Sequence, residues 1–102
     1  MLVIAGKNNI AVNALNYVIE QLDIKIAVVC NETDDGVHSW QQSLRKTAKD
    51  KEVRILTLAE AYDVADVFLS LEFDKIIRPA NFRTDRLYNI HFSLLPKYKG
   101  MY

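Results

Sequence analysis

The sequence predicts an α/β protein in which helices cover both faces of a mostly parallel sheet. Short runs rich in Val and Ile alternate along the chain with stretches of helical periodicity. These runs are apolar at consecutive positions, which is typical of parallel strands buried on both sides. The 102 residues, half of them hydrophobic, suffice for one domain with its own core. We therefore treat residues 1–102 as a single structural unit.

The first predicted unit is a buried strand at residues 2–5 that ends at Gly6. A helix is expected from about residue 10 to residue 22, because apolar residues recur there at helical spacing. Asn9 immediately precedes this helix and is its expected N-cap. A second buried strand follows at residues 24–30.

The second helix is expected to begin after Ser39, which is its predicted cap. Trp40 shares one face of this helix with Leu44 and Ala48. Large apolar side chains at that spacing usually face the core. We therefore expect Trp40 to be buried.

Shorter elements fill the C-terminal half of the sequence. Thr57 and Glu60 have the spacing of a capping box, which predicts a helix that runs to about Val64. The remaining expected elements are strands at residues 53–56, 67–69 and 87–91, a short extended piece at 75–78 and a polar turn at 79–85. This alternating order is Rossmann-like, with right-handed crossovers. Ligands bind such sheets at the carboxyl ends of the strands, where residues 6–9, 70–74 and 89–91 are predicted to converge.

Composition excludes several classes of function. Acidic and basic residues balance at 13 each, so no basic field is available for nucleic acid or a membrane surface. Cys30 is the single cysteine and is expected to be a reduced, buried thiol. No Cys/His cluster indicates a metal site, no segment is long enough to span a bilayer, and no secretory leader is recognisable. These features predict a cytoplasmic protein.

The run NIHFSLLPKYKG, residues 89–100, carries the strongest functional signal. Asn89 and His91 are two positions apart at a strand end, so their side chains lie on the same side of an extended backbone. An amide can hold a carbonyl oxygen while an imidazole accepts a proton, and acyl transfer to an amine needs both. On spacing alone, a structural role for the two residues at the strand end stays open.

The same run resembles the signature N-x-H-P-S-L-L-P of the formyltransferases that use 10-formyltetrahydrofolate. The resemblance implies that Asn89 and His91 are catalytic and that 10-formyltetrahydrofolate is the formyl donor. Phe92 stands where the family usually has Pro. The family's third catalytic residue, an Asp, would fall beyond Tyr102. The resemblance therefore implies that residues 1–102 are the N-terminal part of a truncated formyltransferase catalytic domain.

Lys7, Asn8 and Asn9 form a candidate substrate site. They follow a glycine at the first strand-to-helix turn, where a helix N-terminus suits a phosphate group. This segment resembles that of family members that formylate an amino sugar linked to a nucleotide. A simple turn with an N-cap would explain Asn9 but not Lys7.

Lys75, Ile76 and Ile77 form a candidate cofactor site. They fall where the family lines its folate pocket with one basic and two aliphatic residues. Apolar walls suit the flat pterin ring. A buried strand with a flanking lysine would explain the two isoleucines equally well.

The resemblance as a whole implies formyl transfer to the amine of a nucleotide-linked amino sugar, without a metal. Two alternatives stay open: a formyltransferase that acts on methionyl-tRNA or on a ribonucleotide amine, and an inactive fragment that only binds ligand. The missing third residue predicts little turnover by this chain alone. An uncovered sheet edge would favour a homodimer.

Overall fold

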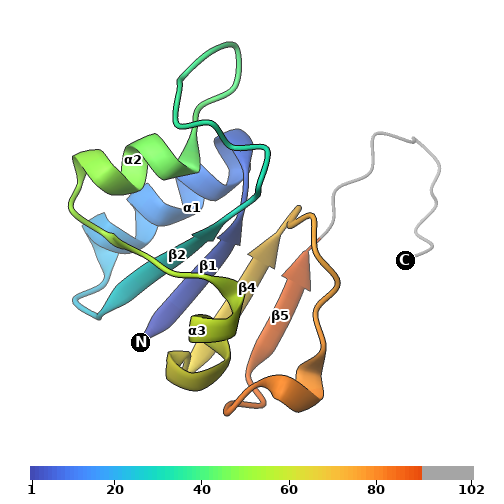
Figure 1. The fold of residues 1–102 in the computed structure, drawn as a ribbon. Helices are drawn as coiled ribbons and strands as arrows, with labels where there is room; N and C mark the ends of the chain where they lie inside the picture. Colours follow the sequence, from blue (N-terminus) through green and yellow to red (C-terminus); the bar gives the residue numbers. More distant parts are fainter. Residues whose placement is uncertain (91–102) are drawn as a thin grey trace, which may run out of the picture.

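The computed structural model describes residues 1–90; residues 91–102, His91 among them, lie outside the described part. The described residues form five strands, three α-helices and one short 3₁₀ helix (Figure 1). In chain order these are β1 (Leu2–Gly6), α1 (Asn8–Gln21), β2 (Ile26–Cys30), α2 (Leu44–Asp50), β3 (Arg54–Ile55), α3 (Leu58–Val64), β4 (Val67–Leu71), η1 (Pro79–Asn81) and β5 (Leu87–Ile90). The predicted alternation of strands and helices is confirmed.

The five strands form one sheet in the order β3-β2-β1-β4-β5, and all four pairings are parallel. Their carboxyl ends therefore meet at one edge, toward which the arrows of Figure 1 point. The chain moves outward from β1 to β3 and then returns to the other side of β1. Ligands of such sheets bind where the order reverses, here between β1 and β4.

Each face of the sheet has its own hydrophobic core, as expected for strands that are apolar at consecutive positions. Val3 and Phe68 pack on the face that α3 covers through Ala61. Ile4 and Leu71 pack on the opposite face, which α1 and α2 cover. Full burial of one such side chain stabilises the fold by about 1.5–3 kcal/mol.

Helix α1 begins at Asn8, two residues earlier than predicted, and Asn9 is not its N-cap. The N-cap is Lys7, whose side chain makes no capping hydrogen bond. Asn8 has a φ of 61°, a left-handed conformation that asparagine tolerates better than most residues. The side chain of Asn9 instead accepts a 2.8 Å hydrogen bond from the backbone N–H of Gln42.

The predictions for Ser39 and Trp40 are wrong. Helix α2 begins at Leu44, and Ser43 is its cap, with its hydroxyl accepting a 3.0 Å hydrogen bond from Lys46 N–H. Trp40 lies before the helix and is 86% exposed. Helical spacing alone cannot tell a helix from the loop that precedes it, and the serine four residues later supplies the cap.

The capping box is confirmed. The hydroxyl of Thr57 accepts a 3.1 Å hydrogen bond from Glu60 N–H, and the Glu60 carboxylate accepts a 2.8 Å bond from Thr57 N–H. Strand β4 extends to Leu71, two residues beyond its predicted end, because Ser70 and Leu71 pair with β5. The alternative of a buried strand around Ile76 is wrong, since this side chain is 79% exposed.

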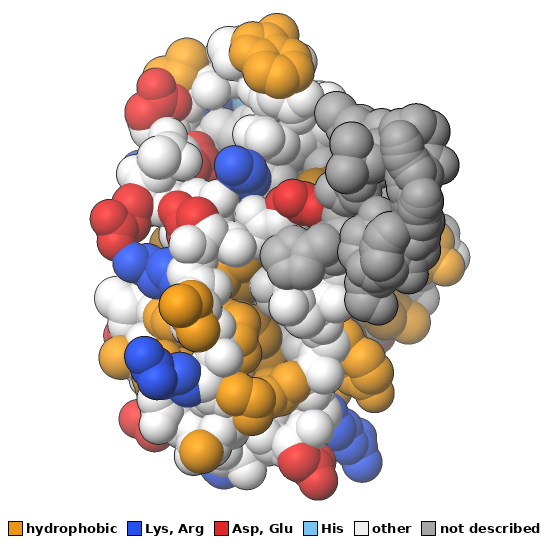
Figure 2. Space-filling model, turned by 90° about the vertical axis from the view of Figure 1, so that its right-hand side faces the viewer, with side chains coloured by type: hydrophobic (Ala, Val, Ile, Leu, Met, Phe, Trp, Pro, Cys, Tyr) orange, Lys and Arg blue, Asp and Glu red, His pale blue; other side chains and the backbone are white. Residues whose placement is uncertain are grey.

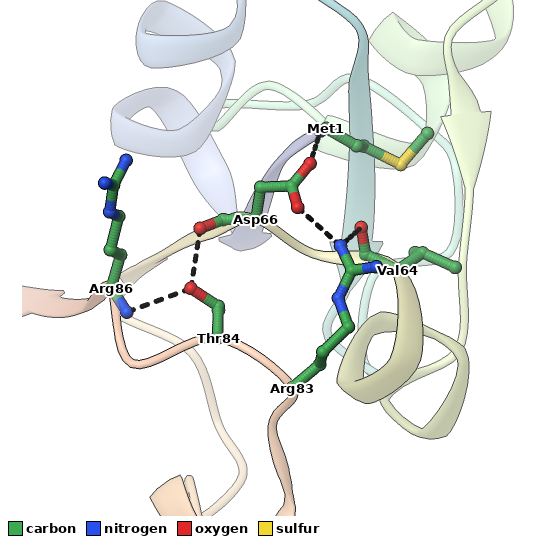
Figure 3. A network of polar contacts seen from close by, with 6 residues as sticks. All are labelled: Met1, Val64, Asp66, Arg83, Thr84 and Arg86. Carbon is green, nitrogen blue, oxygen red and sulfur yellow. Dashed lines mark hydrogen bonds and ion pairs between the residues drawn. The ribbon is translucent and has the colours of Figure 1, made fainter.

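A network of polar contacts joins segments at the edge of the sheet where the strands begin, opposite the edge formed by their carboxyl ends (Figure 3). The carboxylate of Asp66 pairs with the terminal amine of Met1 and with the guanidinium of Arg83. The hydroxyl of Thr84 donates a 2.7 Å hydrogen bond to the Asp66 carbonyl oxygen and accepts a 3.1 Å bond from Arg86 N–H. The start of β1, the start of β4 and the segment that leads into β5 are thus joined.

Within residues 1–90, none of the helices has the length and apolar character needed to cross a membrane. The same residues contain no group of three or more His, Cys, Asp or Glu side chains placed to hold a metal ion. Cys30 is free and buried, as predicted.

Candidate functional site

Two groups of predicted site residues meet in one pocket of about 410 Å³, which we call the β4–β5 pocket. It contains the predicted catalytic residue Asn89 and the predicted cofactor residues. Its lining residues are Ser70, Phe73, Asp74, Lys75, Ile76, Ile77 and Asn89. These residues come from the end of β4, the following loop and β5.

Strand pairing places Asn89 in this pocket. Asn89 lies opposite Ser70 in the register of β4 and β5. Ser70 is buried, whereas Asn89 is exposed at the edge of the sheet. Neighbouring strands present paired residues on the same face, so the amide and the hydroxyl stand on the α3 side of the sheet.

The loop that carries Lys75 is held by the end of β2. The backbone N–H of Asp74 donates a 3.3 Å hydrogen bond to the side-chain oxygen of the fully buried Asn31. Glu32 forms an ion pair with Lys75. The hydrogen bond and charge of Glu32 raise the pKa of Lys75, and those of Lys75 lower the pKa of Glu32. Lys75 therefore stays a cation, with its side chain already paired.

The walls of the β4–β5 pocket suit a flat heteroaromatic group. Phe73 is buried and Ile77 packs against the same core, so both offer fixed apolar surface. Ile76 adds an exposed aliphatic side chain at the rim. The carboxylate of Asp74 and the amide of Asn89 supply polar groups for orientation. The residues present thus fit the pterin of a folate.

Lys7 and Asn8 lie in a different pocket, of about 210 Å³, which we call the first-turn pocket. One wall is the turn between β1 and α1, and the other is the loop between β2 and α2. The loop residues are Thr33, Asp34, Asp35, Val37, Ser39, Trp40, Gln41, Gln42 and Ser43. Asn9, predicted as the third member of this group, lies outside the lining.

Asp34 organises the loop wall of the first-turn pocket. Its carboxylate accepts hydrogen bonds from the Ser43 hydroxyl, from Arg45 N–H at 2.9 Å and from Gly36 N–H at 3.1 Å. Burial acts to raise the pKa of Asp34, but these bonds outweigh it and hold the pKa below its usual value. The carboxylate is therefore ionised at neutral pH and fixes the loop.

Most of the predicted site residues lie in two separate pockets. Asn89 and residues 75–77 come together, while Lys7 and Asn8 occupy the second pocket. The predicted catalytic partner His91 lies outside the described residues. Sequence reasoning missed Asn31, whose only signal is a polar residue directly after a buried strand. Its side-chain nitrogen is buried without a hydrogen-bond partner among residues 1–90.

Comparison with solved structures decides the relationship. WlaRD, a sugar 3N-formyl transferase solved in the presence of dTDP and 5-N-formyl-THF, is 51% identical over 96% of this chain, with a TM-score of 0.86. The N-formyltransferase from Helicobacter canadensis, in complex with folinic acid and dTDP-3-aminofucose, is 48% identical over 96%, with a TM-score of 0.85. Over nearly its whole length, the chain is thus similar in sequence and in fold to two sugar N-formyltransferases.

The resemblance seen in the run from Asn89 to Gly100 is thereby confirmed, together with the α/β fold. The chain spans 37% and 38% of the lengths of these two formyltransferases. No protein-family model and no curated protein matches the sequence. The individual site residues stay predictions.

Proposed function

We propose that this protein takes part in transferring a formyl group from 10-formyltetrahydrofolate to the amino group of a nucleotide-linked amino sugar. The single observation that carries the proposal is the identity of 51% and 48% to two sugar N-formyltransferases over 96% of the chain. One of these relatives holds dTDP-3-aminofucose with folinic acid. We further propose that residues 1–102 correspond to the N-terminal part of the catalytic domain, in line with the share of each relative that the chain spans.

Asn89 and His91 are the proposed catalytic residues. The bound folate supplies the formyl carbon. The Asn89 amide N–H donates to the formyl oxygen and stabilises negative charge on it while the amine of the sugar adds. The His91 imidazole accepts a proton from the attacking amine, a role that suits a group whose ordinary pKa is about 6.5. The bond between the formyl carbon and N10 of the folate then breaks, and N10 takes up a proton as tetrahydrofolate leaves. The place of Asn89 in the lining of the β4–β5 pocket supports its part of this scheme.

Lys75, Ile76 and Ile77 are the proposed cofactor-binding residues. The two isoleucines give the pterin an aliphatic surface, and Lys75 places a positive charge near the anionic tail of a folate. The two links to this loop from the residues that follow β2, Asn31 and Glu32, support a preformed site. Preformed sites lose less entropy on binding.

Lys7 and Asn8 are the proposed contacts to the nucleotide-linked sugar. Lys7 is the N-cap residue of the 14-residue helix α1, and a helix N-terminus favours phosphate. Asn9 was predicted as a third contact. We now propose that it acts indirectly, since its side-chain oxygen is bound to the backbone of Gln42.

Formyl transfer in vitro tests this function. An active formyltransferase that contains residues 1–102 is incubated with 10-formyltetrahydrofolate and a dTDP-linked amino sugar, and release of tetrahydrofolate is followed. Turnover that depends on Asn89 supports the proposal, with the exposed Asn13→Ala variant on α1 as the matched control. Calorimetric binding of both ligands without turnover would instead support the ligand-binding alternative. Formylation of methionyl-tRNA or of a ribonucleotide amine in place of the sugar would contradict the acceptor.

We also propose a cytoplasmic homodimer. A reducing compartment agrees with the single buried thiol of Cys30. Figure 2, which looks onto the β5 side, shows hydrophobic side chains gathered over the lower part of that face. On β5 itself, Tyr88 is 57% exposed and Ile90 is 40% exposed. Exposed apolar edge strands favour association.

A further inference from the structure

Trp40 is the only tryptophan of the chain, and its side chain is 86% exposed. Tryptophan is usually largely buried, because its indole carries much apolar surface. An exposed indole in the wall of a pocket is therefore a candidate contact for a flat ligand.

The loop that presents Trp40 is held on both sides of it. Asp34 binds Ser43 and Arg45, which follow Trp40 in the sequence. The His38 ring nitrogen Nδ1 accepts a 3.0 Å hydrogen bond from Ser43 N–H. The exposure of the indole is thus built into the loop and does not result from missing loop contacts.

Two reciprocal hydrogen bonds join the residues after Trp40 to the first turn of α1. The backbone N–H of Asn9 donates to the side-chain oxygen of Gln41 at 3.1 Å, and the side-chain oxygen of Asn9 accepts from Gln42 N–H at 2.8 Å. This clasp keeps the indole in the same pocket as Lys7 and Asn8.

The two walls of the first-turn pocket offer different chemistry. The turn supplies the cationic residue Lys7, and the loop supplies the exposed aromatic side chain of Trp40. A ligand that carries both an anionic group and a flat ring fits this combination. A nucleotide is such a ligand, since its phosphates suit a cation and its base can stack on an indole.

We propose that Trp40 stacks against the base of the nucleotide-linked sugar, and that Asn9 is a positioning residue that holds the Trp40 loop against the first turn. The inference rests on the function proposed above and adds a base-binding contact to it. The pocket of about 210 Å³ would take only part of a nucleotide-linked sugar.

Intrinsic fluorescence gives a direct test, because Trp40 is the only tryptophan in residues 1–102. Titration of the chain with dTDP should quench this fluorescence, and Trp40→Ala should weaken dTDP binding in calorimetry by about tenfold, as expected for loss of one stacked base. Trp40→Phe should restore most of the affinity. Tyr17→Ala, which removes an exposed aromatic ring elsewhere on α1, is the control.

Inorganic pyrophosphate separates the base contact from the phosphate contact. Trp40→Ala and Asn9→Ala should weaken binding of dTDP but not of pyrophosphate, whereas Lys7→Ala should weaken both. Asn9→Asp keeps the acceptor for Gln42 N–H and should retain dTDP affinity and quenching, which a generally destabilised turn would not do.

Several outcomes would overturn the inference. Unchanged dTDP affinity in Trp40→Ala, without quenching in the unmodified protein, would remove the stacking role and leave the proposed function standing. No dTDP binding by the unmodified protein would overturn both. Equal losses of dTDP and pyrophosphate binding in Asn9→Ala would mean that Asn9 supports the whole pocket and does not position Trp40.

Discussion

A Cβ atom placed on Gly6 would lie 2.1 Å from the backbone carbonyl oxygen of Leu71. The two residues are partners in the parallel register of β1 and β4, at the point where the strand order reverses. The Cβ of Ala11 at the start of α1 would lie 3.3 Å away. The absence of a side chain at Gly6 therefore allows β1, β4 and α1 to approach one another closely at the carboxyl ends of the strands.

Gly6→Ala should lower the free energy of unfolding by about 3 kcal/mol or more, at the upper end of the usual overpacking effect, because a backbone carbonyl must move. Urea denaturation measures the loss. Gly36→Ala is the matched control: Gly36 has a φ of 82°, and its added Cβ would meet only the side chain of Arg45, with Cδ at 3.6 Å and Cγ at 4.0 Å. That change should cost about 1 kcal/mol through left-handed strain alone. Equal losses in the two variants would contradict the close approach.

Asp66 should make stability depend on acid pH. The terminal amine of Met1 lowers the pKa of this carboxyl below 3.8, through a hydrogen bond and through its positive charge. The positive charge of Arg83 acts in the same direction. A carboxyl with a lowered folded pKa stabilises the fold above its unfolded pKa and loses that contribution as the pH falls through the folded value. The difference in unfolding free energy between the unmodified protein and Asp66→Asn should thus be constant near neutrality and shrink below about pH 4.

Denaturation curves at a series of pH values measure this difference. Asp63→Asn removes an exposed carboxylate from α3 and serves as the control. A difference for Asp66→Asn that grows on acidification would refute the assignment.

Cys30 should react slowly with thiol reagents in the folded protein. Burial raises the pKa of its thiol to about 11, although the positive charge of Arg45 acts in the opposite direction. Only the thiolate reacts, so a rise of about two pH units from 9.0 lowers the alkylation rate at pH 8 about 100-fold. The rate is measured against that of the urea-unfolded chain. Comparable rates in the two states would show that the thiol is not shielded.

Asn89→Ala and His91→Ala should each lower turnover strongly in an active formyltransferase that contains this chain. Loss of an oxyanion donor costs about 10²–10³ in rate, and loss of a general base about 10²–10⁴. If the two residues act as one unit, the double variant should be much less impaired than the product of the single effects. Single-turnover kinetics measure the rate of formyl transfer in each variant, and circular dichroism checks that each variant is folded. Near-normal turnover of either single variant would remove that residue from the mechanism.

The α/β fold could be read from local patterns. Consecutive apolar residues identified β1 and β2, and the Thr57–Glu60 pair identified the start of α3. These features depend on residues within one helical turn or one strand. Their conformational preferences can therefore be recognised from the local sequence. The ends of elements were less predictable: β4 runs on to Leu71 because β5 pairs with it.

By itself, the sequence determined the order of strands and helices, the buried Cys30 and the relationship to formyltransferases through the run that begins at Asn89. Only the tertiary structure decided that Trp40 is exposed and that Asn9 binds Gln42. The physical reason is distance along the chain. The Asn9–Gln42 and Asn31–Asp74 hydrogen bonds join groups 33 and 43 residues apart, and such contacts form only once the strands have paired and brought their carboxyl ends to one edge.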